Sequence, residues 1–507
     1  MSDEPRKSVI ERYTDVVIRF RYAIVVATVI ACVLLGFGQS QIGFSGDYRY
    51  YFGETTPQNE ALEVLDTNYA NADSIYFALT PKDGKTVFDN ETLEAVTRLT
   101  EEAWLLPYVS RVDSLANFQH TRAEGLDNLI VEDLVRAPAE LTRAQIDNIE
   151  KHALAEPSLI NSIVSADGKH TGVNAVLRLS GDSPGETGKA VAAARKLAKT
   201  IEKNYPVAVR LTGVHMMNHA FTEIGMGDIK LLMPVMYGLM VVILFALFRS
   251  FLQVLMTAVL VFLTTMAAQG LVGWLGILLT APSSIAPTII LTLAVADSVH
   301  VIKSFVNAKR DGKSKEDAVR ESLRLNYKPV FLTTITTIFG FLALNFADAP
   351  PYHDLGNITA MGVGIAFILS LSLLPAMLVI LPTWIKHRSE GQQMKFLGAW
   401  NKLADVVVNR RAAVVLAFAV LAIGLSIPIP GLVLDDRWVE YFSEDTAFRK
   451  DADFVQDHVT GMYSVEFNLK SPGANEISKI EYLEAVNEFA EFYRRQDNVY
   501  NVSVITD

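Results

Sequence analysis

Seven apolar segments, each long enough to cross a lipid bilayer as a helix, dominate this 507-residue sequence. A spanning helix needs about 20 mostly apolar residues, because only a closed set of backbone hydrogen bonds is tolerated in hydrocarbon. The segments cover residues 22–37, 231–248, 251–279, 285–302, 329–346, 358–381 and 412–430. The first has no small-residue cleavage site after "VLLGFGQSQIG" and further spans follow it, so it predicts an uncleaved anchor.

Lysine and arginine residues gather on one side of these segments. They occur in the N-terminal stretch, in the loop after the fourth segment (303–328) and in the loop after the sixth (386–411). The opposite short loops, "TAPSS" and "ADAPPYHDLGN", contain neither residue. Since basic loops stay in the cytoplasm, the N-terminus is predicted to be cytoplasmic and residues 39–227 to lie outside, which in a bacterium is the periplasm. The outside region contains no disulfide, which favours a bacterial inner membrane.

The composition limits what the water-exposed part can do. A charged fraction of 20% predicts at least one sizeable aqueous domain, and the single cysteine, Cys32, excludes a disulfide within the chain. The net charge of −11 argues against a nucleic-acid partner. The string "NAKRDGKS" has Asn307 where a phosphate-binding loop needs its first glycine, so direct use of ATP through such a loop is not supported.

The outside region contains two strand–helix–strand units. The first comprises "SIYFAL", an amphipathic helix beginning at Asn90 as its N-cap, and "VSRVDSL"; the second comprises "TGVNAVLRLS", "ETGKAVAAARKLAKTIEKN" and "VAVRLTGV". Two such units predict a ferredoxin-like α+β domain. The stretch between them, about 126–165, is polar and helical in character.

The chain also begins to repeat itself. "RYAIVV" at 21 matches "RAAVVL" at 411, "YF" at 51 matches "YF" at 441, and "LEAV" at 93 returns at 483, each 390 residues later. A constant offset across a span, a strand and a helix predicts an internal repeat, which in transporters places the substrate path between the two copies. The second copy reaches one βαβ unit at residue 507, so we expect the chain to be a C-terminally truncated part of a longer protein.

One acid lies inside the fourth segment. In "LTLAVADSVHVIKSF" Asp297 is near mid-span, and His300, three residues later, shares its helical face. A carboxylate at the bilayer centre costs at least ~3 kcal/mol, so such acids are rare and commonly functional. Two interpretations remain open. Asp297 alternates between protonated and ionised forms, or it is a static hydrogen-bonding group held by a hydroxyl such as those of "TTITT" at 333–337. His300 either passes the proton on or only faces water and headgroups.

The order of these parts resembles that of the resistance-nodulation-division superfamily: one span, a large outside domain, five more spans, and then the start of the same order again. The motif "AVADSVHVI" resembles its MmpL-type, hopanoid-exporter and Patched-like branch. The tripartite drug pumps carry two adjacent acids at this point, whereas Ser298 follows Asp297 here, and mycobacterial members typically have tyrosine there. The resemblance implies a polytopic α-helical membrane protein with a periplasmic α+β porter domain.

The resemblance also implies a division of the chain and a function. It divides into an N-terminal stretch (1–21), a first span (22–38), a porter domain (39–227), a sterol-sensing-like five-helix domain (228–382), a connector (383–411), a seventh span (412–430) and an incomplete second periplasmic domain (431–507). It implies a proton relay of Asp297, Ser298 and His300 that drives export of lipid-like or hydrophobic molecules. No catalysis, cofactor or metal is expected. The expected binding partners are membrane lipids, an apolar substrate and a periplasmic partner or a second copy of the chain. A lipid or sterol sensor and a protein-translocation accessory remain alternatives.

Overall fold

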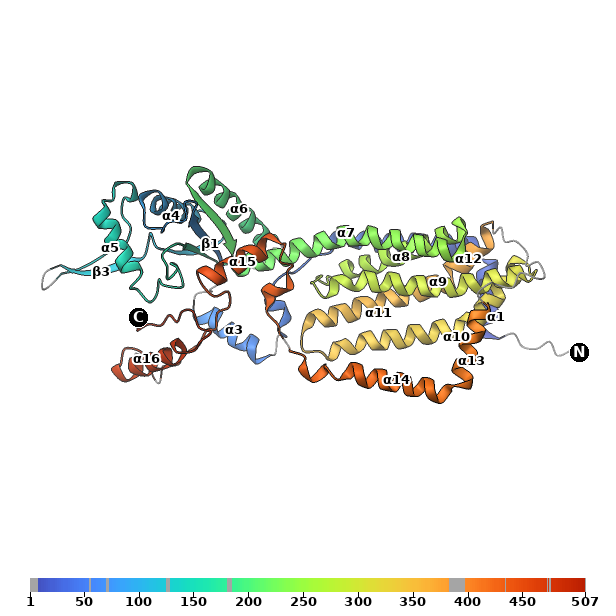
Figure 1. Ribbon diagram of the computed structural model, residues 1–507. Helices are drawn as coiled ribbons and strands as arrows, with labels where there is room; N and C mark the ends of the chain where they lie inside the picture. The colour runs from blue at the N-terminus through green and yellow to red at the C-terminus, as the bar shows by residue number, and fades with distance from the viewer. Residues whose placement is uncertain are drawn as a thin grey trace, which may run out of the picture.

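The computed structural model describes residues 8–53, 56–69, 73–124, 128–179, 185–382, 397–433, 435–471, 473 and 476–506. Figure 1 shows an elongated molecule with a bundle of long helices at one end and a mixed α+β domain at the other. This arrangement confirms the predicted fold class of a polytopic helical protein with an α+β domain outside the bundle. Residues 383–396 of the predicted connector lie outside the described residues.

Among the residues that the structure describes, seven helical stretches are long and apolar enough to cross a membrane, and each coincides with one predicted segment. The centre of the bundle is formed by α8, α9 and α11, whose spans are the most buried, whereas α14 has no buried residue. The spans are α2 (Arg21–Gly36) with η1 (Phe37–Gln41), α7 (Val214–Phe248), α8 (Phe251–Trp274), η4 (Ser283–Ile285) with α9 (Ala286–Arg310), α10 (Lys315–Leu342) with η5 (Ala343–Phe346), α11 (Pro350–Leu371) with α12 (Leu373–Ile380), and α14 (Arg411–Ser426) with η6 (Ile429–Gly431).

The prediction of a basic loop at 303–328 was wrong. Helix α9 continues to Arg310 and α10 already begins at Lys315, so most of these basic residues lie on helices that extend beyond the apolar segments. Ser314 caps α10 by accepting a hydrogen bond from the backbone N–H of Asp317 at 3.1 Å. Lysine and arginine are good helix formers, so a basic stretch with a serine cap continues a helix as readily as it forms a loop.

The outside domain contains the predicted ferredoxin-like arrangement. Its four strands pair antiparallel in the order β2-β5-β1-β6. Helices α4 and α6 cross over between β1 and β2 and between β5 and β6, and their apolar faces share one core with the sheet. The elements are β1 (Ser74–Pro81), α4 (Asn90–Ala103), β2 (Val109–Ser114), β5 (Thr171–Leu177), α6 (Glu186–Asn204) and β6 (Val207–Thr212).

The stretch between the two units differs from the prediction of helix over 126–165. Strands β3 (Gln119–Glu124) and β4 (Asn128–Asp133) pair with each other in a separate two-stranded sheet, and within the described part of this stretch only α5 (Arg143–Ala153) is α-helical, after the short η3 (Pro138–Glu140). Strand β3 is mostly polar and β4 has its apolar residues in one run, so neither strand shows the apolar alternation on which strand prediction depends.

The predicted N-cap of α4 was also wrong by one residue. Asp89 accepts a hydrogen bond from the backbone N–H of Thr92 at 2.9 Å and therefore caps the helix. The side chain of Asn90 instead donates to the carbonyl oxygens of Pro138 and Leu141, at 2.8 and 3.1 Å. Either residue type is a good cap, so sequence alone does not separate the two positions.

The helix boundaries follow the internal repeat. Three pairs of elements begin and end 390 residues apart: α2 and α14, η2 (Tyr48–Tyr51) and η7 (Trp438–Tyr441), and α3 (Pro57–Asn68) and α15 (Ala447–His458). At the same offset, α16 (Ile480–Arg494) begins as α4 does, and α13 (Leu397–Asn409) ends as α1 (Val9–Arg19) does. In the second copy, only the helix of the predicted βαβ unit, α16, forms within the described residues. The segments at the positions of its two strands, 464–471 and 498–504, form no strand there.

Candidate functional site

Asp297 lies on α9 at the edge of the face that packs into the bundle. Ala294 and Val301, one turn to either side, are fully buried, while the Asp297 side chain is half-buried. Within the described part of the chain, its carboxyl group has no hydrogen bond or ion pair. A charge without a partner in such surroundings is costly, so the neutral form of this group is favoured by its position.

The structure does not join Ser298 and His300 to Asp297. Ser298 is fully buried, and its hydroxyl donates to the carbonyl oxygen of Ala294 in the same helix at 2.8 Å. His300 is exposed on the surface of the bundle. The three residues share α9, but no hydrogen bond connects them in the described residues. Their predicted role as a relay remains a prediction.

The hydroxyl groups of "TTITT" do not hold Asp297 either. Thr333 and Thr336 donate to carbonyl oxygens of their own helix, at Pro329 and Leu332. The Thr334 hydroxyl is buried and has no partner within the described residues. Within the described residues, none of these hydroxyl groups is hydrogen-bonded to Asp297, and the static interpretation remains a prediction.

Asn326 is a polar residue near this depth that sequence analysis missed. The Ser322 hydroxyl of α10 donates to the carbonyl oxygen of Val301 in α9 at 2.7 Å, which fixes the level of the two helices. Because they run antiparallel, one turn from Val301 to Asp297 corresponds to one turn from Ser322 to Asn326. Asn326 is buried, and its amide donates to the Ser322 carbonyl oxygen. The sequence offered only one sign of this residue's position: an amide side chain three residues before the fifth apolar segment, which begins at residue 329.

A second candidate site lies outside the bundle, where the two copies of the repeat meet. A cavity of about 350 Å³ is bordered by η2 and α3 of the first copy and by η7 and residues 462–466 of the second. Arg49 lines it and pairs with Asp66 and Asp73 at 3.1 and 2.7 Å. Burial and the charges of Asp73 and Asp66 raise the pKa of Glu466 at the same cavity. Sequence analysis placed a substrate path between the two copies but named none of these residues, because the walls of the cavity lie almost 400 residues apart in the chain.

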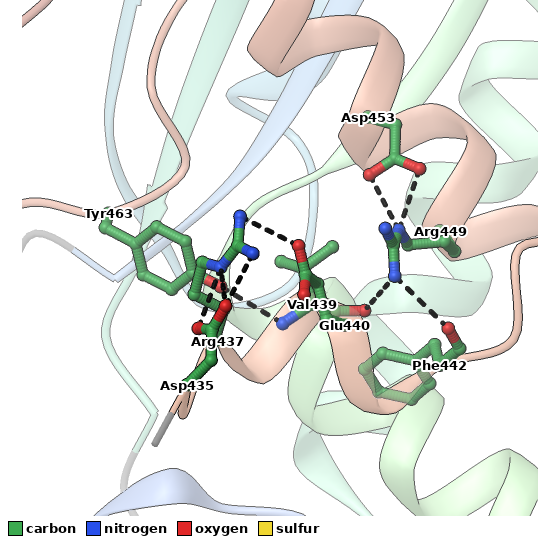
Figure 2. A network of polar contacts seen from close by, with 8 residues as sticks. All are labelled: Asp435, Arg437, Val439, Glu440, Phe442, Arg449, Asp453 and Tyr463. Carbon is green, nitrogen blue, oxygen red and sulfur yellow. Dashed lines mark hydrogen bonds and ion pairs between the residues drawn. The ribbon is translucent and has the colours of Figure 1, made fainter. Parts of the chain in front are cut away.

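A polar network holds the second-copy wall of the cavity in place (Figure 2). The backbone N–H of Val439 donates to the Tyr463 hydroxyl oxygen at 3.2 Å, and both residues line the cavity. Arg449 of α15 donates to the carbonyl oxygens of Val439 and Phe442 and pairs with Asp453 at 2.7 Å. These bonds hold η7, which borders the cavity, in place against α15.

The described residues contain no group of three or more histidine, cysteine, aspartate or glutamate side chains placed to hold a metal ion.

The chain has a bundle of membrane helices, with a ferredoxin-like domain between its first and second spans and an acid in the fourth span. The start of a second copy of this order follows. These features define a multi-pass membrane protein with an internal repeat. The chain belongs to the MMPL family, whose model matches residues 58–415. This confirms the resemblance to the MmpL-type branch of the resistance-nodulation-division superfamily.

Three relatives show the range of this similarity. A Methanocaldococcus jannaschii protein named as a membrane protein is 30% identical over 139 residues, covering 27% of this chain and 36% of that protein. The siderophore exporter MmpL5 of Mycobacterium tuberculosis is 22% identical over 300 residues, 57% of this chain and 31% of the relative. The mycolic acid-containing lipids exporter MmpL11 of Mycolicibacterium smegmatis is 23% identical over 217 residues, 40% and 22% respectively. The chain thus spans about a third or less of the length of these relatives.

Proposed function

We propose that this chain is part of a proton-driven exporter of lipid-like or other hydrophobic molecules in a bacterial inner membrane. The observation that carries the proposal is the Asp297 carboxyl group, half-buried in α9 and without a hydrogen bond or ion pair in the described residues. A carboxyl group in that position can bind a proton from one side and release it to the other when its surroundings change. Relatives named as exporters of lipids and of a siderophore support the transport class.

The cavity between the two copies supports an amphipathic substrate. Aromatic and aliphatic side chains such as Tyr48, Leu62 and Trp438 line it together with the Arg49 ion pairs and Glu466. Mostly apolar walls with a few charged groups are typical of ligand sites, and transporter repeats commonly place the substrate path between them. The α+β domain provides this path outside the membrane.

The proposed orientation places the N-terminus and the loop between α9 and α10 in the cytoplasm and the α+β domain in the periplasm. Single-cysteine labelling tests it in a Cys32→Ala background, which removes the one native cysteine. With a membrane-impermeant maleimide on intact cells, Lys85→Cys in the α+β domain should react and Lys313→Cys should not. Reaction of both, or of Lys313→Cys alone, contradicts the orientation.

Asp297→Asn is the test of the proton-coupled step, since it keeps the shape and removes the titration. The protein is reconstituted in vesicles of phosphatidylethanolamine and phosphatidylglycerol, and movement of a fluorescent phospholipid is followed under an imposed pH gradient. The variant should insert and fold like the wild type but lose the movement that depends on the gradient. Ser298→Ala is the matched control and should retain it, because that hydroxyl is bonded within its own helix.

The outcomes separate the alternatives. Wild-type movement by Asp297→Asn would show that the acid has a static role. A wild-type protein that binds the phospholipid but never moves it under a gradient indicates a sensor. Crosslinking of the α+β domain to nascent secreted chains indicates a translocation accessory.

A further inference from the structure

The base of the α+β domain is joined to the bundle by a hydrogen bond between side chains. The hydroxyl of Tyr50, in η2, donates to Oδ2 of Asp354, in the second turn of α11, at 2.9 Å. The two residues are 304 positions apart in the chain. Burial raises the pKa of Tyr50 to about 12, and the hydrogen bond to Asp354 adds to this effect. Tyr50 therefore remains a neutral hydrogen-bond donor throughout the physiological pH range.

Helix α11 also lies in close contact with the helix that carries Asp297. At Gly362 of α11 an added Cβ would lie 2.2 Å from Cδ1 of Ile290 in α9, so any larger residue would have to displace the Ile290 side chain. Ile290 is seven residues before Asp297, which is two helical turns on the same face of α9. The face of α9 that bears Asp297 is thus the face that meshes with α11.

The same alignment brings a polar group of α11 to the depth of Asp297. Both helices start at the end of the bundle that faces the α+β domain, so they run parallel, and Ile290 beside Gly362 places Asp297 near residues 369–370. Ser370 is fully buried there, and its hydroxyl has no partner within the described residues. A buried polar group without a partner is costly, so an arrangement of α9 and α11 that supplies Ser370 with a partner at this depth is favoured.

From these contacts we propose that α11 is the coupling element of the transporter. It transmits a change at Asp297 to the base of the α+β domain, with Tyr50 and Asp354 as the positioning residues that join them. The proposal rests on the proposed function, because it needs a change of state at Asp297. Closely packed helices shift as units, by about 1–2 Å in known transitions, so a displacement of α11 against α9 moves Asp354 and pulls on η2. Tyr48 of the same η2 lines the cavity, so the displacement reaches the candidate substrate site.

The test compares three variants of this bond in the same vesicles. Tyr50→Phe and Asp354→Leu remove the hydrogen bond, whereas Asp354→Asn keeps an amide oxygen that accepts it. Phospholipid movement should fall about tenfold in the first two variants and stay near the wild-type rate in Asp354→Asn. The double variant Tyr50→Phe with Asp354→Leu should be no slower than either single variant, because one bond is lost in each case. Tyr352→Phe, which removes a hydroxyl two residues before Asp354, is the matched control.

A second measurement separates coupling from folding. Modification of Asp297 by a carbodiimide, which reacts with protonated carboxyl groups, is recorded against pH. In Tyr50→Phe this profile should match the wild type although phospholipid movement falls about tenfold, and protons should cross without phospholipid. Wild-type transport by Tyr50→Phe overturns the coupling proposal, and so does a loss of transport that only follows a loss of folded protein. If Asp297→Asn itself transports normally, the proposed function fails instead, so the two failures are distinct.

Discussion

The guanidinium carbon of Arg210 lies 3.7 Å from the ring centroid of Phe454. Arg210 belongs to β6 of the first copy, and Phe454 belongs to α15 of the second. Beside this pair, Val455 of α15 and Val459, the residue that ends this helix, pack on Tyr76 and Ala78 of β1. The second copy thus contributes the helix that covers one face of the sheet of the first copy.

Phe454→Ala should loosen α15 from this sheet. The substitution removes a cation–π contact and part of an apolar contact, together about 1–3 kcal/mol for a half-buried ring. Hydrogen exchange of the α15 backbone amides should become faster by the corresponding factor, while exchange in α4 stays unchanged. Phe492→Ala on α16 is the control, because that ring is 60% exposed. If the α15 amides exchange at the same rate in the wild type and in Phe454→Ala, the contact does not stabilise the docking of α15.

The packing of α15 illustrates how far the sequence could predict the fold. The repeat offset, the seven spans and the ferredoxin-like order all follow from local patterns of apolar residues. Strand β1 is buried on both faces: Ile75, Phe77 and Leu79 face α4 and α6, and Tyr76 and Ala78 face α15. A strand without polar alternation indicates that both faces of the sheet are covered, but it does not identify the helix that covers the second face. That information is held in contacts more than 370 residues apart.

The α15 contact should also weaken in acid, because His170 lies buried beside it. Its Nδ1 is hydrogen-bonded to the Thr80 hydroxyl at 2.9 Å, and the rings of Phe454 and His458 lie 5.2 and 5.3 Å away. Burial lowers the pKa of His170, and the charges of His458, Arg210 and Lys169 lower it further, while Asp167 opposes them. The undocked form therefore binds a proton more readily. The contribution of neutral His170 to docking is present in full above the ordinary pKa of ~6.5 and is lost as the pH falls through the depressed pKa.

Cysteine labelling measures this pH dependence. In a Cys32→Ala background, Val455→Cys reports on the buried face of α15 and Asp457→Cys on its exposed face. From pH 8 to pH 5, labelling at 455 should rise relative to labelling at 457, after correction for thiol ionisation. His170→Gln should remove most of this rise. A ratio that does not change with pH in the wild type contradicts the role of His170.

The candidate sites were predictable to different degrees. Asp297 was identified from sequence because a carboxylate in an apolar segment is conspicuous whatever it contacts. The bond of Ser298 to its own helix and the exposure of His300 depend on which face of α9 packs inward, which periodicity within a fully apolar span does not specify. The bond between Tyr50 and Asp354 lies at the boundary of two domains, and neither residue is unusual in its local sequence.

The contact between the first and third spans gives a last prediction, because its closeness depends on glycine. At Gly270 of α8 an added Cβ would lie 1.9 Å from the carbonyl oxygen of Leu35, and at Gly38 it would lie 2.0 Å from the Gly270 carbonyl oxygen. The indole N–H of Trp274 donates to the same Leu35 oxygen at 3.1 Å, so the two backbones are held together at this point. Small residues allow such approach between membrane helices, and forcing extra atoms into a packed contact costs about 1–3 kcal/mol.

Gly270→Ala should therefore lower the melting temperature of the detergent-solubilised protein by several degrees. Gly238→Ala on α7 is the matched control, since an added Cβ there meets no atom within 4 Å. In that variant alanine replaces glycine inside a helix without a clash, so the melting temperature should stay the same or rise slightly. Equal melting temperatures for the two variants would mean that α2 and α8 separate at little cost. The close approach at Leu35 would then be no source of stability for the bundle.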